Sequence, residues 1–142
     1  MVYIDTSVAV ALLTVEPATK SVQQWFEALS DVPVGSDWLI TEFASALSIK
    51  TRMGQLTPAQ ARVVRAEFEL LCSSGLRIAP VSRSAFANAA ALAAAPRHGL
   101  RAGDALHLAV AKEMRAKFVA TLDQAMLGNL KRLGFATAAI SR

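Results

Sequence analysis

A short apolar run that stops at an acid opens the chain, and it constrains the fold more than any other feature. Val2-Tyr3-Ile4 is β-branched and aromatic, Asp5 ends the run, and a helical pattern of small apolar residues follows at once. This pattern is typical of a buried strand with a helix directly after it. In open α/β sheets, ligands bind at the carboxyl ends of the strands. Asp5 is therefore placed either as a site residue or as the N-cap of the following helix.

The same order of apolar strand, hydroxyl residue and acid returns at Lys117–Asp123. Further strands are expected at residues 33–36, 76–81 and 135–140. Helical patterns fill the stretches between them, at about 21–29, 38–53, 57–73, 82–95, from 105 onward and after 123. This alternation predicts an α/β fold, a three-layer α/β/α sandwich with a mainly parallel central sheet. A length of 142 residues suits one domain, over residues 1–142.

Helical spacing also predicts which side chains are buried. Trp25 and Phe26 are interpreted as packing residues. Asp37 is expected to cap the helix at 38–53, Thr57 the next helix, and Ser82 or Ser84 the alanine-rich one. The predicted core of the two central helices comprises Trp38, Leu39, Phe43, Ala46, Leu47 and Ile49 in the first, and Val63, Val64, Phe68, Leu70 and Leu71 in the second.

Composition limits the location and the partners of the protein. Cys72 is the only cysteine, which excludes an internal disulfide. No apolar run is long enough to span a membrane, and Asp5 ahead of Ser7–Leu13 argues against a signal peptide, so a cytoplasmic location is expected. The apolar content of 54% suggests a surface that a partner covers. The net charge of +4 favours a polyanionic partner, although most cations are interpreted as solvated helix faces.

Four acids stand out because of their positions: Asp5, Glu42, Asp104 and Asp123. Each aspartate alone is also consistent with a plain N-cap, but Glu42 lies inside a helix on an apolar face, where an unpaired acid is costly. Clustered carboxylates repel one another, and Mg²⁺ or Mn²⁺ relieves that repulsion through oxygen ligands. We therefore expect the four carboxylates to surround one shared ion.

The two histidines do not change this expectation. Histidines and the one cysteine have no spacing that suits zinc. His107 is interpreted as a core histidine or a partner contact, and His98 as a surface residue.

Four motifs in this order resemble PIN-domain ribonucleases of the VapC toxin type. They are Ile4-Asp5-Thr6-Ser7 with the helix to Leu13, Thr41–Leu47 around Glu42, Leu100–Ala109 around Asp104, and Ala120–Asp123. The resemblance spans nearly the whole chain. It implies a Mg²⁺- or Mn²⁺-dependent endoribonuclease that cuts RNA, a cognate antitoxin as partner, and a homodimer.

The resemblance also implies roles for individual residues. Asp5, Glu42, Asp104 and Asp123 would form the acidic catalytic site, and Asp5 and Asp104 would hold the metal most directly. Thr6, Ser7 and Thr121 would support these acids through hydrogen bonds. Arg101 would contact the phosphate backbone of the RNA.

Three other functions are the alternatives to this one. A phosphosignalling receiver domain needs an acidic pair near the first strand and a lysine after the last, and neither is present. A phosphatase of the haloacid dehalogenase type needs an aspartate where Ser7 stands. A catalytically silent PIN-like module that only binds protein stays open as an alternative, although it leaves Glu42 unexplained.

Overall fold

A parallel five-stranded sheet forms the centre of the molecule, in the computed structural model that describes residues 1–141. Arg142, the last residue of the expected domain, lies outside the described residues. All neighbouring strands pair in parallel in the order β3-β2-β1-β4-β5. The strands are β1 (Val2–Ile4), β2 (Val34–Ser36), β3 (Arg77–Ala79), β4 (Phe118–Ala120) and β5 (Ala136–Thr137). The predicted parallel sheet is therefore confirmed.

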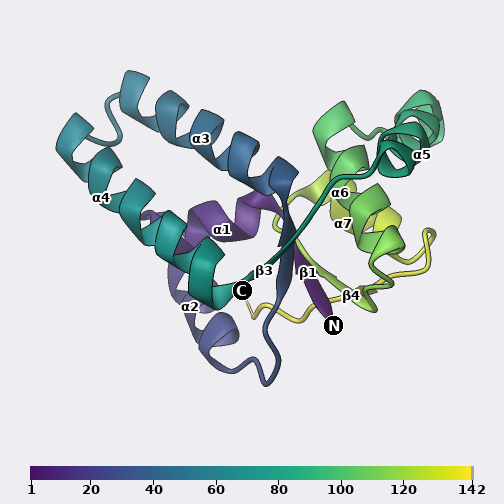
Figure 1. The fold of residues 1–142 in the computed structure, drawn as a ribbon, viewed down its shortest axis with the longest axis horizontal. Coiled ribbons are helices and arrows are strands. Elements are labelled where there is room, and N and C mark those ends of the chain that lie inside the picture. Colours follow the sequence, from purple (N-terminus) through teal and green to yellow (C-terminus); the bar gives the residue numbers. More distant parts are fainter. Residues whose placement is uncertain (142) are drawn as a thin grey trace.

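Helices cover both faces of this sheet (Figure 1). On one face lie α1 (Thr6–Leu13), α2 (Thr19–Glu27), α3 (Asp37–Arg52) and α4 (Pro58–Leu70), and on the other α5 (Arg83–Ala94), α6 (Ala102–Glu113) and α7 (Gln124–Leu130). A π-helical turn, Leu71–Gly75, extends α4, and a 3₁₀ turn, Pro96–His98, precedes α6. The three-layer α/β/α sandwich is confirmed. None of the helices in residues 1–141 has the length and apolar character that crossing a membrane requires.

The central strand β1 divides the core into two clusters because successive side chains of a strand point to opposite faces. Tyr3 belongs to the cluster under α5, α6 and α7, and Ile4 to the cluster under α1 to α4. Both side chains are fully buried. Ile4 pairs with Ala120 of β4 in the register of the sheet. This register places Asp5 beside Thr121 at the carboxyl edge of the two strands.

The helix N-caps predicted at Thr57 and Ser82 are confirmed, and the one predicted at Asp37 is wrong. Thr57 and Gln60 form a capping box at the start of α4, and Ser82 caps α5. Asp37 is not a cap, because it is the first residue of α3 and Ser36 holds the N-cap position. Ser36 is the extended last residue of β2, so strand and helix follow one another without a connecting residue.

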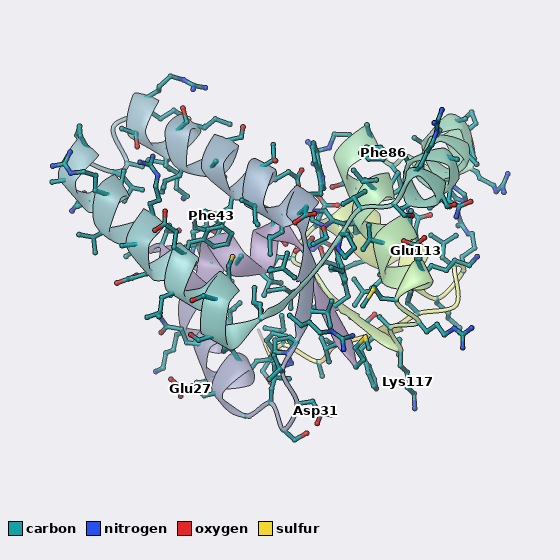
Figure 2. All side chains as sticks on the ribbon, viewed as in Figure 1. Glu27, Asp31, Phe43, Phe86, Glu113 and Lys117 are labelled. Carbon is teal, nitrogen blue, oxygen red and sulfur yellow. The ribbon has the colours of Figure 1, made fainter. Side chains whose placement is uncertain are left out.

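The helices α3 and α4 project together from the sheet as a hairpin (Figure 1). Phe43 and Phe68 stack between them at a centroid distance of 3.8 Å (Figure 2 labels Phe43). Three residues that were predicted to be core are exposed instead: Ile49 at 44%, Val63 at 59% and Leu70 at 65%. Because the hairpin reaches beyond the sheet, each of its helices has only one covered stripe.

Two further predictions concern residues outside this hairpin. Trp25 and Phe26 are partly buried and meet edge to face at 6.5 Å, which confirms their packing role.

His98 is not a surface residue, because only 7% of it is exposed. Its ring contacts the Leu92 carbonyl at 3.0 Å, and its own carbonyl accepts from the Asn129 amide at 2.7 Å. These contacts close the 3₁₀ turn against α5 and α7.

Candidate active site

Asp5 stands at the carboxyl end of β1 and caps α1. Its Oδ1 accepts hydrogen bonds from the Val8 N–H at 3.2 Å and the Ser7 hydroxyl at 2.6 Å, and its Oδ2 accepts from the Thr121 hydroxyl. Both interpretations of Asp5 are therefore compatible with the structure. One oxygen completes the helix cap, while the other faces the end of β4.

Burial strongly affects the ionisation of Asp5, whose exposed fraction is 3%. Removal from water raises the pKa of this carboxyl, and the electrostatic interaction with His107 and the hydrogen bonds from Ser7, Thr121 and the Val8 N–H only partly oppose that rise. Ser7 also accepts a hydrogen bond from the Leu122 N–H at 2.9 Å. The structure thus brings Ser7 and Thr121, two of the three expected supporting residues, into contact with Asp5.

Asp123 follows β4 and is the N-cap residue of α7, as Asp5 is of α1. Its Oδ1 accepts from the Met126 N–H at 2.9 Å and so caps α7. Its own N–H donates to the Thr121 hydroxyl at 3.0 Å, which ties it to Asp5. Its Oδ2 lies 3.4 Å from a guanidinium nitrogen of Arg101.

Asp104 lies in the first turn of α6, and Arg101 is the N-cap residue of that helix. Burial raises the pKa of the Asp104 carboxyl, and the negative charges of Asp123 and Glu42 raise it further. The Arg101 guanidinium, 3.5 Å from Asp104 Oδ2, lowers that pKa in part. Arg101 has an 81% exposed side chain, so it is a weakly held counter-ion between two acids.

Three helix N-termini meet at this edge of the sheet, those of α1, α6 and α7. Each carries an aspartate at its cap or in its first turn. The free N–H groups and the helix dipole favour negative charge at such ends. The edge therefore suits both the aspartates and an anionic ligand such as a phosphate.

Glu42 approaches from α3 on the far side of this edge. Its Oε1 accepts from the Thr6 hydroxyl at 2.6 Å and lies 2.5 Å from His107 Nε2. Burial raises the pKa of the Glu42 carboxyl, but the hydrogen bonds from His107 and Thr6 and the electrostatic interactions with His107 and Arg101 together outweigh that rise, and the net shift is downward. The contact between His107 and Glu42 was not expected from the sequence. The available signal was the spacing of three residues between His107 and Asp104, which puts both on one face of α6.

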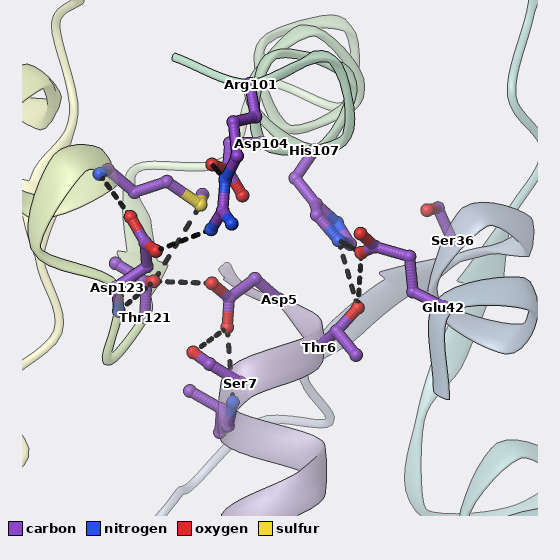
Figure 3. Close-up of polar contacts among 12 residues, drawn as sticks. Asp5, Thr6, Ser7, Ser36, Glu42, Arg101, Asp104, His107, Thr121 and Asp123 are labelled. Atoms are coloured by element: carbon purple, nitrogen blue, oxygen red, sulfur yellow. Dashed lines mark hydrogen bonds and ion pairs between the residues drawn. The ribbon is translucent and has the colours of Figure 1, made fainter. Parts of the chain in front are cut away.

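Figure 3 shows the side chains of Asp5, Asp104 and Asp123 around the Arg101 guanidinium, with Glu42 turned toward Thr6 and His107. Within residues 1–141, no three His, Cys, Asp or Glu side chains are grouped so that they could hold a metal ion as they stand. The chemistry of the donors nevertheless fits a hard divalent cation, because the groups that face one another are carboxylates whose charges conflict. Arg101 supplies the positive charge that such an ion would bring.

Comparison with known proteins gives a consistent result. The family profile described as PIN domain matches residues 2–133. Ribonuclease VapC47 of Mycobacterium tuberculosis is 31% identical over 140 residues, which cover 97% of this chain and 96% of that protein. The crystal structure of Mycobacterium tuberculosis VapC20, described as a sarcin-ricin loop cleaving toxin, superposes with a TM-score of 0.74 at 17% identity, covering 96% and 97% of the two chains. A toxin–antitoxin complex from Klebsiella pneumoniae superposes with a TM-score of 0.67 at 18% identity, covering 99% and 100%.

Proposed function

The chain belongs to the PIN-domain family, and from this premise we propose that it is an endoribonuclease that hydrolyses RNA phosphodiester bonds as the toxin of a toxin–antitoxin pair. The observation that carries the proposal is the meeting of Asp5, Asp104 and Asp123 at three helix N-termini, with Glu42 beside them. The likeness to Ribonuclease VapC47 over almost the whole chain supports the same reaction.

The proposed cofactor is Mg²⁺ or Mn²⁺. Asp5 and Asp104 would hold the ion most directly, and Glu42 and Asp123 would complete its surroundings. When bound, such an ion lowers the pKa of a water molecule and stabilises charge on a phosphate. The Arg101 guanidinium, which lies between Asp104 and Asp123, would leave that place for these two acids to hold the ion.

The other side chains of the site have separate roles in the proposed reaction. Ser7 and Thr121 hold Asp5 in one orientation, so that its oxygens need no reordering for the reaction. Glu42, whose lowered pKa keeps it ionised at neutral pH, orients the attacking water. Attack of water on phosphorus breaks the bond to the 3′ oxygen. The expected products are a 5′-phosphate and a 3′-hydroxyl.

Arg101 is the proposed contact to the RNA backbone. Its side chain is 81% exposed and forms ion pairs with Asp104 and Asp123 at the site. A guanidinium binds phosphate well because two of its N–H groups can donate parallel hydrogen bonds to two phosphate oxygens. Movement of Arg101 from the aspartates to a phosphate would free the acids for the metal.

The proposed partner is a cognate antitoxin, in keeping with the toxin–antitoxin complex that shares the fold. A groove of about 480 Å³ between α3 and α4 fits an apolar segment of such a protein. Its lining is mainly apolar, with one cation and one anion: Ile40, Phe43, Ala44, Leu47, Arg65, Phe68, Glu69, Cys72, Ser73 and Ile78. Antitoxin contacts around Trp25, Phe26 and Trp38, and a homodimer, also stay predictions.

The test is cleavage of RNA by the purified chain, freed from any antitoxin. With Mg²⁺ or Mn²⁺ the chain should cut structured RNA, and a chelator should stop the reaction. Asp5→Asn and Asp104→Asn should each reduce cutting by at least about 100-fold, since removal of a direct ligand exceeds the 10- to 100-fold typical of outer partners.

Asp31→Asn is the matched control, because Asp31 is an exposed acid at the opposite end of the molecule (Figure 2). Cutting that survives both site variants would refute the assignment of the acids. A chain that cuts nothing with any metal, yet binds its partner, would instead be the silent protein-binding module.

A further inference from the structure

His107 is a deeply buried ionisable side chain near the site that the proposed reaction does not use. Only 1% of it is exposed. Its Nε2 lies 2.5 Å from Glu42 Oε1, and its Nδ1 lies 2.8 Å from the Tyr3 hydroxyl. Tyr3 is fully buried in β1, and its ring meets the imidazole edge to face at 5.8 Å. The Tyr3 hydroxyl is in turn 3.1 Å from the Ser36 hydroxyl.

We propose that His107, held by Tyr3, and Gly103 are positioning residues that fix the Glu42 carboxylate toward the metal of the proposed nuclease. The inference rests on the proposed function for the role of Glu42, but not for the contacts themselves. Glu42 comes from α3, His107 and Gly103 from α6, and Tyr3 from β1. The arrangement therefore couples three elements at the group that orients water.

Hydrogen-bond accounting shows which proton His107 presents to Glu42. A carboxylate only accepts, so a contact of 2.5 Å between Glu42 Oε1 and His107 Nε2 requires a hydrogen on Nε2. If the Tyr3 hydroxyl donates to Nδ1, the imidazole is neutral with its hydrogen on Nε2. If Tyr3 donates to Ser36, Nδ1 donates to Tyr3 and the ring is an imidazolium. In both arrangements Nε2–H points at Glu42.

Gly103 fixes the second oxygen of the same carboxylate. A Cβ atom at Gly103 would lie only 2.7 Å from Glu42 Oε2, closer than real contacts allow. The carboxylate therefore rests against the backbone of the first turn of α6. Thr6 and His107 hold Oε1, and Gly103 leaves room for Oε2 beside Asp104.

The spacing along α6 explains how one helix serves two acids. Residues three apart lie on the same helix face, so Asp104 and His107 both point at the site. Asp104 faces Asp123 and Arg101, while His107 faces Glu42. Outer partners of this kind typically change metal affinity by about 10- to 100-fold when removed.

The test measures binding of Mn²⁺ alone to the full chain by calorimetry, without RNA. His107→Leu should weaken Mn²⁺ binding by about 10-fold or more. Tyr3→Phe, which removes only the hydroxyl, should weaken it less, and His107→Gln should restore part of it by supplying an N–H donor. In a double-mutant cycle, Glu42→Gln and His107→Leu should be non-additive because both act on one carboxylate.

Gly103→Ala keeps the test decisive if the histidine variants fail to fold. Alanine favours a helix interior, yet the added Cβ must displace Glu42, so Mn²⁺ binding should fall without loss of the fold. Gly128→Ala in α7 is the matched control, because no atom apart from its chain neighbours and the nearby backbone of its own helix lies within 4 Å of its Cβ position.

Two results would overturn the proposal. They are Mn²⁺ binding by folded His107→Leu that equals the unmodified chain, or equal effects of Gly103→Ala and Gly128→Ala. A chain that cuts no RNA, but whose Mn²⁺ binding depends on Glu42 and His107 as described, would refute the nuclease and support the positioning role.

Discussion

At the scale of single residues, Asp5 serves two purposes that conflict energetically. Its carboxylate caps α1 through Val8, and it is buried where an ionised group costs free energy. Three donors partly offset that cost, yet the pKa of Asp5 stays raised. Such a group is retained for chemistry rather than for stability.

Asp5→Asn should therefore stabilise the fold while it removes activity. Because the pKa is higher in the folded state, the folded protein binds the proton more tightly, and the free energy of unfolding falls as the pH rises from the ordinary aspartate pKa to the raised one. Asparagine lacks this ionisation. Thermal unfolding should show a similar Tm for both proteins at acid pH and a Tm several degrees higher for the variant at neutral pH. A lower Tm for Asp5→Asn at neutral pH would contradict this account.

Arg101 gives a second prediction at the same scale, because it would compete with a metal for two acids and would also contact the RNA backbone. Arg101→Gln should tighten Mn²⁺ binding, since no cation then opposes the metal at Asp104 and Asp123. It should weaken RNA binding and reduce the slope of log affinity against log salt by about 0.7, the contribution of one phosphate contact of a single strand. Titrations with Mn²⁺ and with RNA measure the two affinities. Arg52→Gln is the control, because Arg52 is an exposed arginine on α3. Weaker Mn²⁺ binding in Arg101→Gln would exclude the competition.

At the scale of helices and strands, the sequence predicts the features that depend on one helix or strand alone better than the contacts between them. The run Val2–Ile4 and the acid after it identify a strand end, and parallel strands bring such ends to one edge. Exposure of Val63 and Leu70 was not predictable, because helical spacing marks an apolar stripe without showing whether another element covers it. The contact of His107 with Glu42 was missed for the same reason. A periodicity shows that His107 is buried, but not that α3 faces it.

The hairpin of α3 and α4 carries a third prediction, at this scale of elements. Ala44 is exposed and lines the apolar groove, so Ala44→Gln should place an amide where an apolar antitoxin segment binds. Burying an unpaired polar group costs about 1–3 kcal/mol, so antitoxin affinity should fall by about 10-fold or more while RNA cutting persists. Ser45→Gln, next along α3 and outside the groove lining, is the control. Equal antitoxin affinity of the two variants would place the partner elsewhere.

At the scale of the whole molecule, a basic hollow lies along the helix that carries Asp104. A cavity of about 720 Å³ has Arg97, Lys112 and Arg132 in its lining and no acidic residue. Within residues 1–141, none of these three cations forms an ion pair with a carboxylate. Unpaired cations around one hollow attract a polyanion, and α6, about 18 Å long, leads from this hollow to the acids.

A strand of RNA that is cut at the acids should therefore also touch this hollow. Replacing the three cations by glutamine should weaken RNA binding and reduce the slope of log affinity against log salt by about 2, because each neutralised phosphate of a single strand adds about 0.7 to that slope. The rate at saturating RNA should persist because the acids are unchanged. Arg52, Arg62 and Arg65 replaced together make the same change in net charge on α3 and α4, and serve as the control. If the slope falls equally in both triple variants, only the overall charge attracts RNA. A smaller slope in the first variant alone makes the hollow part of the path that the substrate takes.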